Sequence, residues 1–150
     1  MAVAIRLLVV TSPDPLPAAP VAGLLKGLTI LVVDDDEDAR ALLHAVLEYS
    51  GAEVVSAESA RGALAALAAL GPRRPDVIIA DLVMPGDDGY ALIRAMRTRA
   101  SVRGVPMIAL TAYAFAHTAD EVLSAGFNAY LKKPVELWEL CRTVARLARC

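Results

Sequence analysis

Short runs rich in apolar and β-branched residues alternate along the chain with longer segments whose apolar residues recur every three or four positions. The runs are LTILVV (28–33), AEVVSA (52–57), DVIIAD (76–81), VPMIALT (105–111) and NAYLK (128–132). Such runs are typical of strands buried on both faces, whereas the longer spacing is typical of amphipathic helices. The pattern therefore predicts five strands, one for each run.

Each predicted strand is followed by a predicted helix. The helices cover residues from about 36 to 50, which precede Gly51, and then 59–71, 90–99, about 117–125 and 136–148. Asp36 or a neighbouring acid is suited to cap the first of them. Regular alternation of strand and helix predicts an α/β fold, a doubly wound and mostly parallel sheet with helices on both faces.

The N-terminal region differs in composition. Residues 11–23 contain four prolines and predict an extended linker. The preceding run AVAIRLLVV is too short to span a bilayer, and its central Arg6 does not suit a signal peptide. It could be an added strand, an interaction segment or the remnant of an upstream domain. We expect residues 1–27 to form an N-terminal extension with this linker, and residues 28–150 to form the folded domain.

Composition and charge narrow the class of protein. A chain with 57% hydrophobic and 21% charged residues is not disordered, and a net charge of -2 gives no general attraction to nucleic acid or membranes. Cys141 and Cys150 lie on one predicted helix about 13 Å apart, too far for a disulfide. These features indicate a reduced, cytoplasmic protein.

Polar residues gather where the predicted strands end. Asp34 and Asp35 follow the first strand, Asp81 ends the third, Thr111 ends the fourth, and Lys132 ends the fifth, followed by Lys133 and Pro134. Any one of them could be a helix cap or a surface residue. However, ligands of open parallel sheets bind at the carboxyl ends of the strands, where the strand order reverses, so the set indicates a functional site.

The chemistry of this set predicts phosphoryl transfer. Two unit charges about 4 Å apart interact by about 4 kcal/mol at an effective dielectric constant near 20, so the three carboxylates must protonate, separate or bind a cation. Oxygen ligands favour Mg²⁺, and a nearby lysine can pair with a phosphate group. Asp81, alone on the middle strand, is the candidate for the nucleophile of an aspartyl phosphate.

These residues lie in a recognisable series of motifs. ILVVDDDEDAR, PDVIIADLVMPGDDGYALIRAMR, MIALTA and AYLKKPVE, in this order, resemble the receiver domain of two-component response regulators, over residues 28–149. The linker and the motifs together are similar to the C-terminal receivers of hybrid histidine kinases. The resemblance implies a flavodoxin-like (βα)5 fold with strand order 2-1-3-4-5, and a cis peptide bond before Pro134.

The resemblance also implies a role for individual residues. Asp81 is the phosphoacceptor, Lys133 pairs with the phosphate, Thr111 is the switch hydroxyl and Tyr130 the aromatic switch. The implied cofactor is Mg²⁺, bound by Asp34, Asp35, Asp81 and the backbone carbonyl of Val83.

The implied function is that of a phosphoacceptor rather than an enzyme. A histidine kinase, acting in trans or within the same protein, would transfer a phosphoryl group from its phosphohistidine to Asp81. The domain would assist this step, and apolar Val83 and bulky Tyr113 would make its own dephosphorylation slow. The fourth helix, fifth strand and fifth helix would then signal to a downstream protein or phosphotransfer partner, without direct contact with nucleic acid or membrane. A monomer or a phosphorylation-dependent dimer is expected.

Three other classes compete with this interpretation. A pseudo-receiver would bind partners without phosphorylation, although the complete set of site residues argues against it. A phosphatase with an aspartate nucleophile would need a second aspartate at position 83, which is a valine. A dinucleotide-binding domain would need GxGxxG after the first strand, and the sequence there is DDDEDA.

Overall fold

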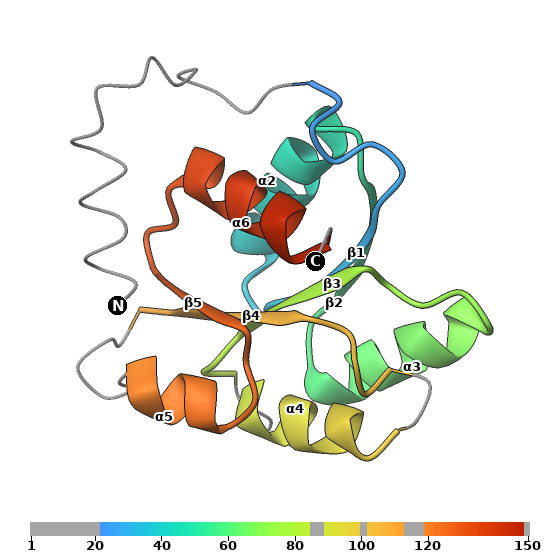
Figure 1. Cartoon of the computed structure of the whole chain (residues 1–150), viewed down its shortest axis with the longest axis vertical. Coiled ribbons are helices and arrows are strands. Elements are labelled where there is room, and N and C mark those ends of the chain that lie inside the picture. Colours follow the sequence, from blue (N-terminus) through green and yellow to red (C-terminus); the bar gives the residue numbers. More distant parts are fainter. Residues whose placement is uncertain (1–21, 85–88, 100–101, 113–118, 149–150) are drawn as a thin grey trace.

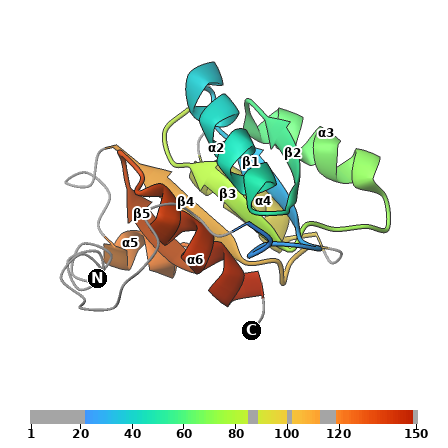
Figure 2. The same cartoon turned by 90° about the horizontal axis from the view of Figure 1, so that it is seen from above.

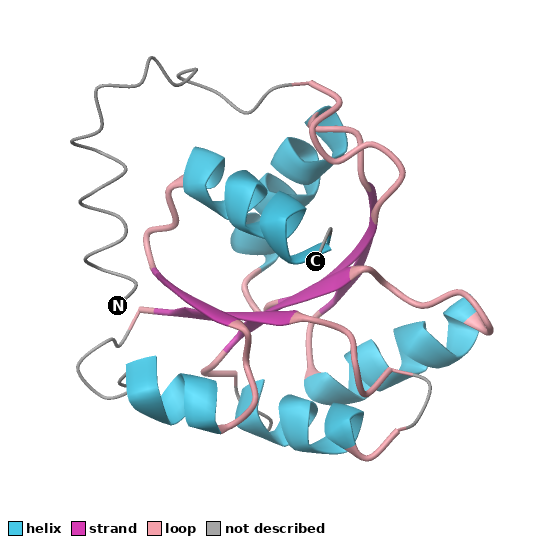
Figure 3. Cartoon of the chain, in the orientation of Figure 1, coloured by secondary structure: helices cyan, strands magenta, loops and turns pink. Residues whose placement is uncertain are grey.

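The computed structural model describes residues 22–84, 89–99, 102–112 and 119–148. Within these residues the chain forms one five-stranded parallel sheet with helices on both sides (Figures 1 and 3). The strands are β1 (Thr29–Val33), β2 (Glu53–Ala57), β3 (Val77–Asp81), β4 (Met107–Thr111) and β5 (Ala129–Lys132). Their order in the sheet is β2-β1-β3-β4-β5, which confirms the predicted flavodoxin-like topology.

The helices lie in two layers. Their bounds are α2 (Glu37–Tyr49), α3 (Ala60–Leu70), α4 (Gly89–Arg97), α5 (Ala119–Ser124) and α6 (Leu137–Ala148). Helices α2 and α6 cover one face of the sheet, and α3, α4 and α5 cover the other (Figure 1). The sheet is thus buried between two apolar layers, which explains why its strands are apolar on both sides.

Alternation along each strand divides the core in two. Leu31 and Val33 of β1 pack in the cluster that contains α3, α4 and α5, whereas Ile30 and Val32 pack with α2 and α6. Successive side chains of a strand point to opposite faces, so one continuous apolar run supplies both clusters. All five residues of β3 are buried.

Side chains cap the N-termini of α2 and α3. Asp36 is the N-cap of α2, and its side chain accepts a hydrogen bond of 3.0 Å from the Asp38 amide. Ser59 caps α3 in the same way, accepting from the Gly62 amide at 3.0 Å. These caps satisfy amides that have no partner within the helix. The predicted role of Asp36 is confirmed.

The segment before β1 contributes to the core. Leu25 is fully buried in the cluster with α2 and α6, and its amide donates to the Ser50 carbonyl at 2.8 Å. The last residues of the predicted N-terminal extension therefore pack against the end of α2. Residues 1–21, which include AVAIRLLVV, lie outside the described residues.

The order of the strands creates the position for a site. Figure 2 shows β1 and β3 in the middle of the sheet, with β2 on one side and β4 and β5 on the other. The chain passes from β1 outward to β2, then returns to place β3 on the other flank of β1. This reversal separates the connections that leave β1 and β3, and in open α/β sheets ligands bind at such a point.

Gly89, the first residue of α4, touches the backbone at the end of β3. A Cβ atom there would lie 2.8 Å from the Asp81 carbonyl oxygen and 3.1 Å from Leu82 Cα. We predict that Gly89→Ala lowers the free energy of unfolding by about 1–3 kcal/mol, because neither backbone atom can yield without displacing Asp81. Urea unfolding measures the change. Gly104→Ala is the control, since its Cβ would meet nothing within 4 Å. Equal stability of the two variants would contradict the prediction.

Candidate functional site

Three carboxylates meet at the ends of the two central strands. Asp34 and Asp35 directly follow β1, and Asp81 is the last residue of β3. One oxygen from each side chain lies within 4.8 Å of the others. Asp34 is fully buried and Asp81 is 7% exposed, whereas Asp35 faces solvent. The structure thus gathers the three acids that the sequence placed at strand ends.

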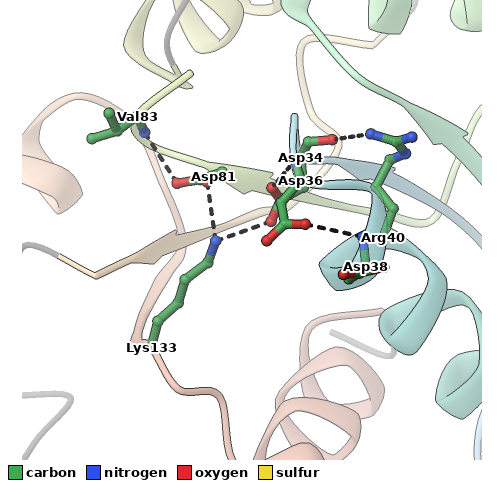
Figure 4. Close-up of polar contacts among 7 residues, drawn as sticks. All are labelled: Asp34, Asp36, Asp38, Arg40, Asp81, Val83 and Lys133. Carbon is green, nitrogen blue, oxygen red and sulfur yellow. Dashed lines mark hydrogen bonds and ion pairs between the residues drawn. The ribbon is translucent and has the colours of Figure 1, made fainter. Parts of the chain in front are cut away.

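Lys133 supplies a cation to two of these acids. Its ammonium lies 3.0 Å from Asp34 Oδ2 and 3.0 Å from Asp81 Oδ2 (Figure 4). The residue follows β5, and its amide donates to the Thr111 carbonyl at 2.7 Å, which ties it to the end of β4. The peptide bond between Lys133 and Pro134 is cis, as expected. Of the two adjacent lysines, Lys133 enters the site, and Lys132 is exposed at the end of β5.

The polar atoms of Asp34 are held from several directions. Oδ1 accepts from the Asp36 amide at 2.9 Å, and the backbone carbonyl accepts from Arg40 Nη1 at 2.8 Å (Figure 4). Its amide donates to the Ala57 carbonyl of β2 at 3.1 Å. Such bonds orient a carboxylate that burial would otherwise make costly. The contact of Arg40 with Asp34 was not predicted from the sequence, although an arginine among acids in a first helical turn is an unusual feature.

Asp81 has fewer stabilising contacts. Its Oδ1 accepts from the Val83 amide at 3.1 Å, and its Oδ2 pairs with Lys133. Burial raises the pKa of Asp81 above its ordinary value, and nearby Asp34 adds to the rise; the Val83 amide and Lys133 oppose it without reversing it. A carboxylate in this state gains from any additional positive charge brought beside it.

The pKa of Lys133 is also raised. Burial lowers the pKa of the ammonium, but its hydrogen bonds and charge interactions with Asp81 and Asp34 outweigh that effect. Lys133 therefore remains a cation and is available to pair with an anion. A permanently charged lysine against a carboxylate pair is suited to holding a phosphoryl group.

The two predicted switch residues lie on the neighbouring strands. Thr111 is fully buried at the end of β4, one residue beyond the register partner of Asp81. Tyr130 is buried on β5, opposite Ala109, and burial raises the pKa of its hydroxyl. It also lines a cavity of about 310 Å³ between α5, β5 and α6. Tyr113 lies outside the described residues.

The donor set fits a magnesium ion. Asp34, Asp35 and Asp81 offer only carboxylate oxygens, which hard divalent cations prefer, and exposed Asp35 leaves the group open to water. Mg²⁺ usually keeps several waters and takes few protein ligands. The Val83 amide donates to Asp81 Oδ1, and the residue as a whole is 43% exposed.

Comparison with known proteins agrees with this geometry. A sequence model of the response regulator receiver domain matches residues 30–145. An uncharacterised 14.6 kDa protein from Leptolyngbya boryana is 43% identical over 80% of this chain and 89% of its own length. The chain therefore belongs to the response regulator receiver domain family, which acts in two-component signal transduction.

Other relatives show the domain within larger proteins. Hybrid signal transduction histidine kinase D of Dictyostelium discoideum is 34% identical over 83% of this chain, which corresponds to 8% of the kinase. The receiver domain of sensor histidine kinase PA1611 from Pseudomonas aeruginosa, solved with magnesium in its active-site cleft, is 33% identical with a TM-score of 0.72. That alignment covers 83% of this chain and 99% of the solved one. Among the described residues, no helix has the length and apolar character needed to cross a membrane.

Asp81→Asn tests the electrostatic cost of the site. The pKa of Asp81 is raised in the folded state, so protonated Asp81 favours the folded protein. This contribution to the free energy of unfolding is fully present below the ordinary pKa of 3.8 and is lost as the pH rises through the folded-state pKa. At neutral pH without Mg²⁺, the neutral amide should therefore raise the unfolding temperature by a few degrees, where 1 kcal/mol corresponds to about 4 °C. Calorimetry at neutral and acidic pH measures this gain, which should disappear in acid.

The matched control is Asp120→Asn, at an exposed acid in the first turn of α5, which should show no comparable gain. A lower unfolding temperature for Asp81→Asn at neutral pH would mean that the pair with Lys133 outweighs the cost of burying Asp81.

Proposed function

We propose that this protein accepts a phosphoryl group on Asp81 from the phosphohistidine of a histidine kinase. The observation that supports this most directly is the carboxylate of Asp81, buried yet held between Lys133 and the Val83 amide, with two further acids beside it. A nucleophilic carboxylate, a fixed cation and ligands for a divalent metal are the components that phosphoryl transfer to aspartate requires.

Each residue of the site has a separate role in the transfer of the phosphoryl group. An oxygen of Asp81 forms a bond to phosphorus as the P–N bond of phosphohistidine breaks, and the electron pair of that bond stays on the imidazole. Lys133 pairs with the phosphoryl oxygens. Asp34, Asp35, Asp81 and the Val83 carbonyl would hold Mg²⁺. When bound, that ion supplies positive charge beside the transferred group. Catalysis then consists of positioning and charge neutralisation, and the domain assists its own modification without turning over a substrate.

Phosphorylation would change the surface of the protein through Thr111 and Tyr130. Thr111 hydrogen-bonds the new phosphoryl group, and Tyr130 moves into the space that Thr111 leaves. Two observations support this order. Thr111 lies at the end of β4 beside the acids, and Tyr130 of β5 is paired with Ala109, the residue of β4 that precedes Thr111 by two positions. The phosphoryl group acts by favouring one of two conformations, with the readout on α5, β5 and α6.

The proposed partners are a histidine kinase and a downstream protein or phosphotransfer domain. The kinase relatives support the first, whether it acts in trans or in the same polypeptide. The net charge of -2 gives no support for nucleic acid or membrane as a direct partner. Buried Cys141, which is a free thiol, is compatible with action in the cytoplasm, as a monomer or a phosphorylation-dependent dimer.

Labelling with a small phosphodonor tests the acceptor. With acetyl phosphate and Mg²⁺, the protein should acquire one acid- and base-labile phosphoryl group, and chelation of the metal should prevent this. Asp81→Asn should keep the fold and lose the label, whereas the control Asp120→Asn should be labelled as the unchanged protein is. Intact-protein mass spectrometry measures both. Labelling of Asp81→Asn at the unchanged level would show that another residue is the acceptor. Magnesium binding without labelling of the unchanged protein would favour a pseudo-receiver.

The lifetime of the phosphorylated state forms a second test. Val83 is 43% exposed beside Asp81, and its side chain has no group that could orient an attacking water. We predict a half-life of minutes or longer after removal of the phosphodonor, and a several-fold shorter one for Val83→Asn, whose amide can hold a water molecule. Loss of the label with time measures both rates. A half-life of seconds for the unchanged protein would contradict this prediction.

A further inference from the structure

Arg40 occupies a position that local rules disfavour. It lies in the first turn of α2, where the positive end of the helix dipole repels a cation. Its amide donates to the Asp36 carbonyl at 3.0 Å, which completes the turn and places the residue next to the β1–α2 connection. The side chain is half-buried, and Nη1 donates to the Asp34 carbonyl at 2.8 Å (Figure 4).

The acceptor of this hydrogen bond belongs to the peptide group that joins Asp34 to Asp35. A peptide group is planar, so fixing its oxygen fixes the plane that leads into both residues. On the other side of Asp34, the amide is bonded to the Ala57 carbonyl at 3.1 Å. Together the two bonds fix the peptide planes on both sides of Asp34, and so the direction of its side chain and the plane from which Asp35 follows.

The other contacts of Asp34 cannot replace this one. Lys133 is shared between Asp34 and Asp81, and the Asp36 amide holds only the carboxylate oxygen Oδ1. Neither contact acts on the peptide plane between the two acids, and Asp35 is exposed. Among the described residues, Arg40 is therefore the side chain that orients the backbone of the acid pair.

We propose that Arg40 is a positioning residue for the divalent cation: it holds the Asp34–Asp35 peptide so that both carboxylates face Asp81. This inference rests on the proposed function, because it concerns the metal that the phosphoryl transfer uses. It adds a residue that touches neither the metal nor the phosphoryl group.

If Arg40 acted only through its charge, it would weaken Mg²⁺ binding rather than strengthen it. A positive charge near a cation site repels the cation, so removing it should strengthen Mg²⁺ binding. Loss of a group that orients metal ligands weakens binding, typically by about 10–100-fold. The sign of the change in Mg²⁺ affinity thus separates positioning from simple charge.

The experiment is a magnesium titration of the full chain by calorimetry, with amide NMR shifts near Asp35 as a second readout. Arg40→Met should raise the Kd for Mg²⁺ by about tenfold. The Kd of Arg40→Lys should lie between that of the unchanged protein and that of Arg40→Met, because an ammonium keeps the charge but lacks the planar fork of donors. The control is Arg61→Met, in the first turn of α3, whose guanidinium makes no hydrogen bond or ion pair within the described residues. Its Kd should stay unchanged or fall slightly.

Thermal unfolding without Mg²⁺ identifies any loss of fold. If Arg40→Met is unfolded at the titration temperature, Arg40→Lys carries the test, and wild-type affinity in that variant overturns the proposal. Equal or tighter Mg²⁺ binding by folded Arg40→Met also overturns it. Failure of the proposed function would give a different result, because the unchanged protein itself would then bind no Mg²⁺ or accept no phosphoryl group.

Discussion

The burial of two carboxylates at adjacent strand ends is the constraint around which this structure is arranged. An uncompensated buried charge costs several kcal/mol, so Asp34 and Asp81 persist only because other groups are directed at them. Lys133 reaches both from the end of β5, and backbone amides supply the remaining contacts. The compensation is incomplete at Asp81, whose pKa remains raised by burial. A further positive charge placed beside Asp81 would therefore stabilise its ionised form.

The topology provides the place where such compensation is possible. The strand order reverses between β1 and β3, so the connections that follow them leave in different directions, with β4 and β5 beside β3. The start of α2 closes one side through the Asp36 cap and Arg40, and Gly89 lets α4 begin directly against the Asp81 carbonyl. The helical layers bury the strands, and the polar chemistry is confined to the edge that they leave open.

The share of each relative that the chain covers differs widely. The chain spans nearly all of the solved receiver domain of PA1611 but only 8% of the Dictyostelium hybrid kinase. What these proteins have in common with this chain is the receiver domain, not the remainder of their architecture.

Local sequence was sufficient to predict the strands and helices, the α/β class, the Asp36 cap and the polar residues at the strand ends. Those features depend on periodicity and on neighbours within a few residues. The choice of Lys133 over Lys132 came from its resemblance to a motif before Pro134. Sequence did not reveal that Arg97 bonds the carbonyls of Val105 and Gly126 across two loops.

Nor did it reveal that Asp34 is buried while Asp35 is exposed, or that Arg40 holds the peptide between them. The pair of Lys133 with Asp34 joins residues 99 positions apart. Such contacts depend on how the packed layers bring distant segments together, and the burial that sets the charge balance exists only once they have packed. The sequence by itself determined which groups reach the edge of the sheet; tertiary packing decided how they meet.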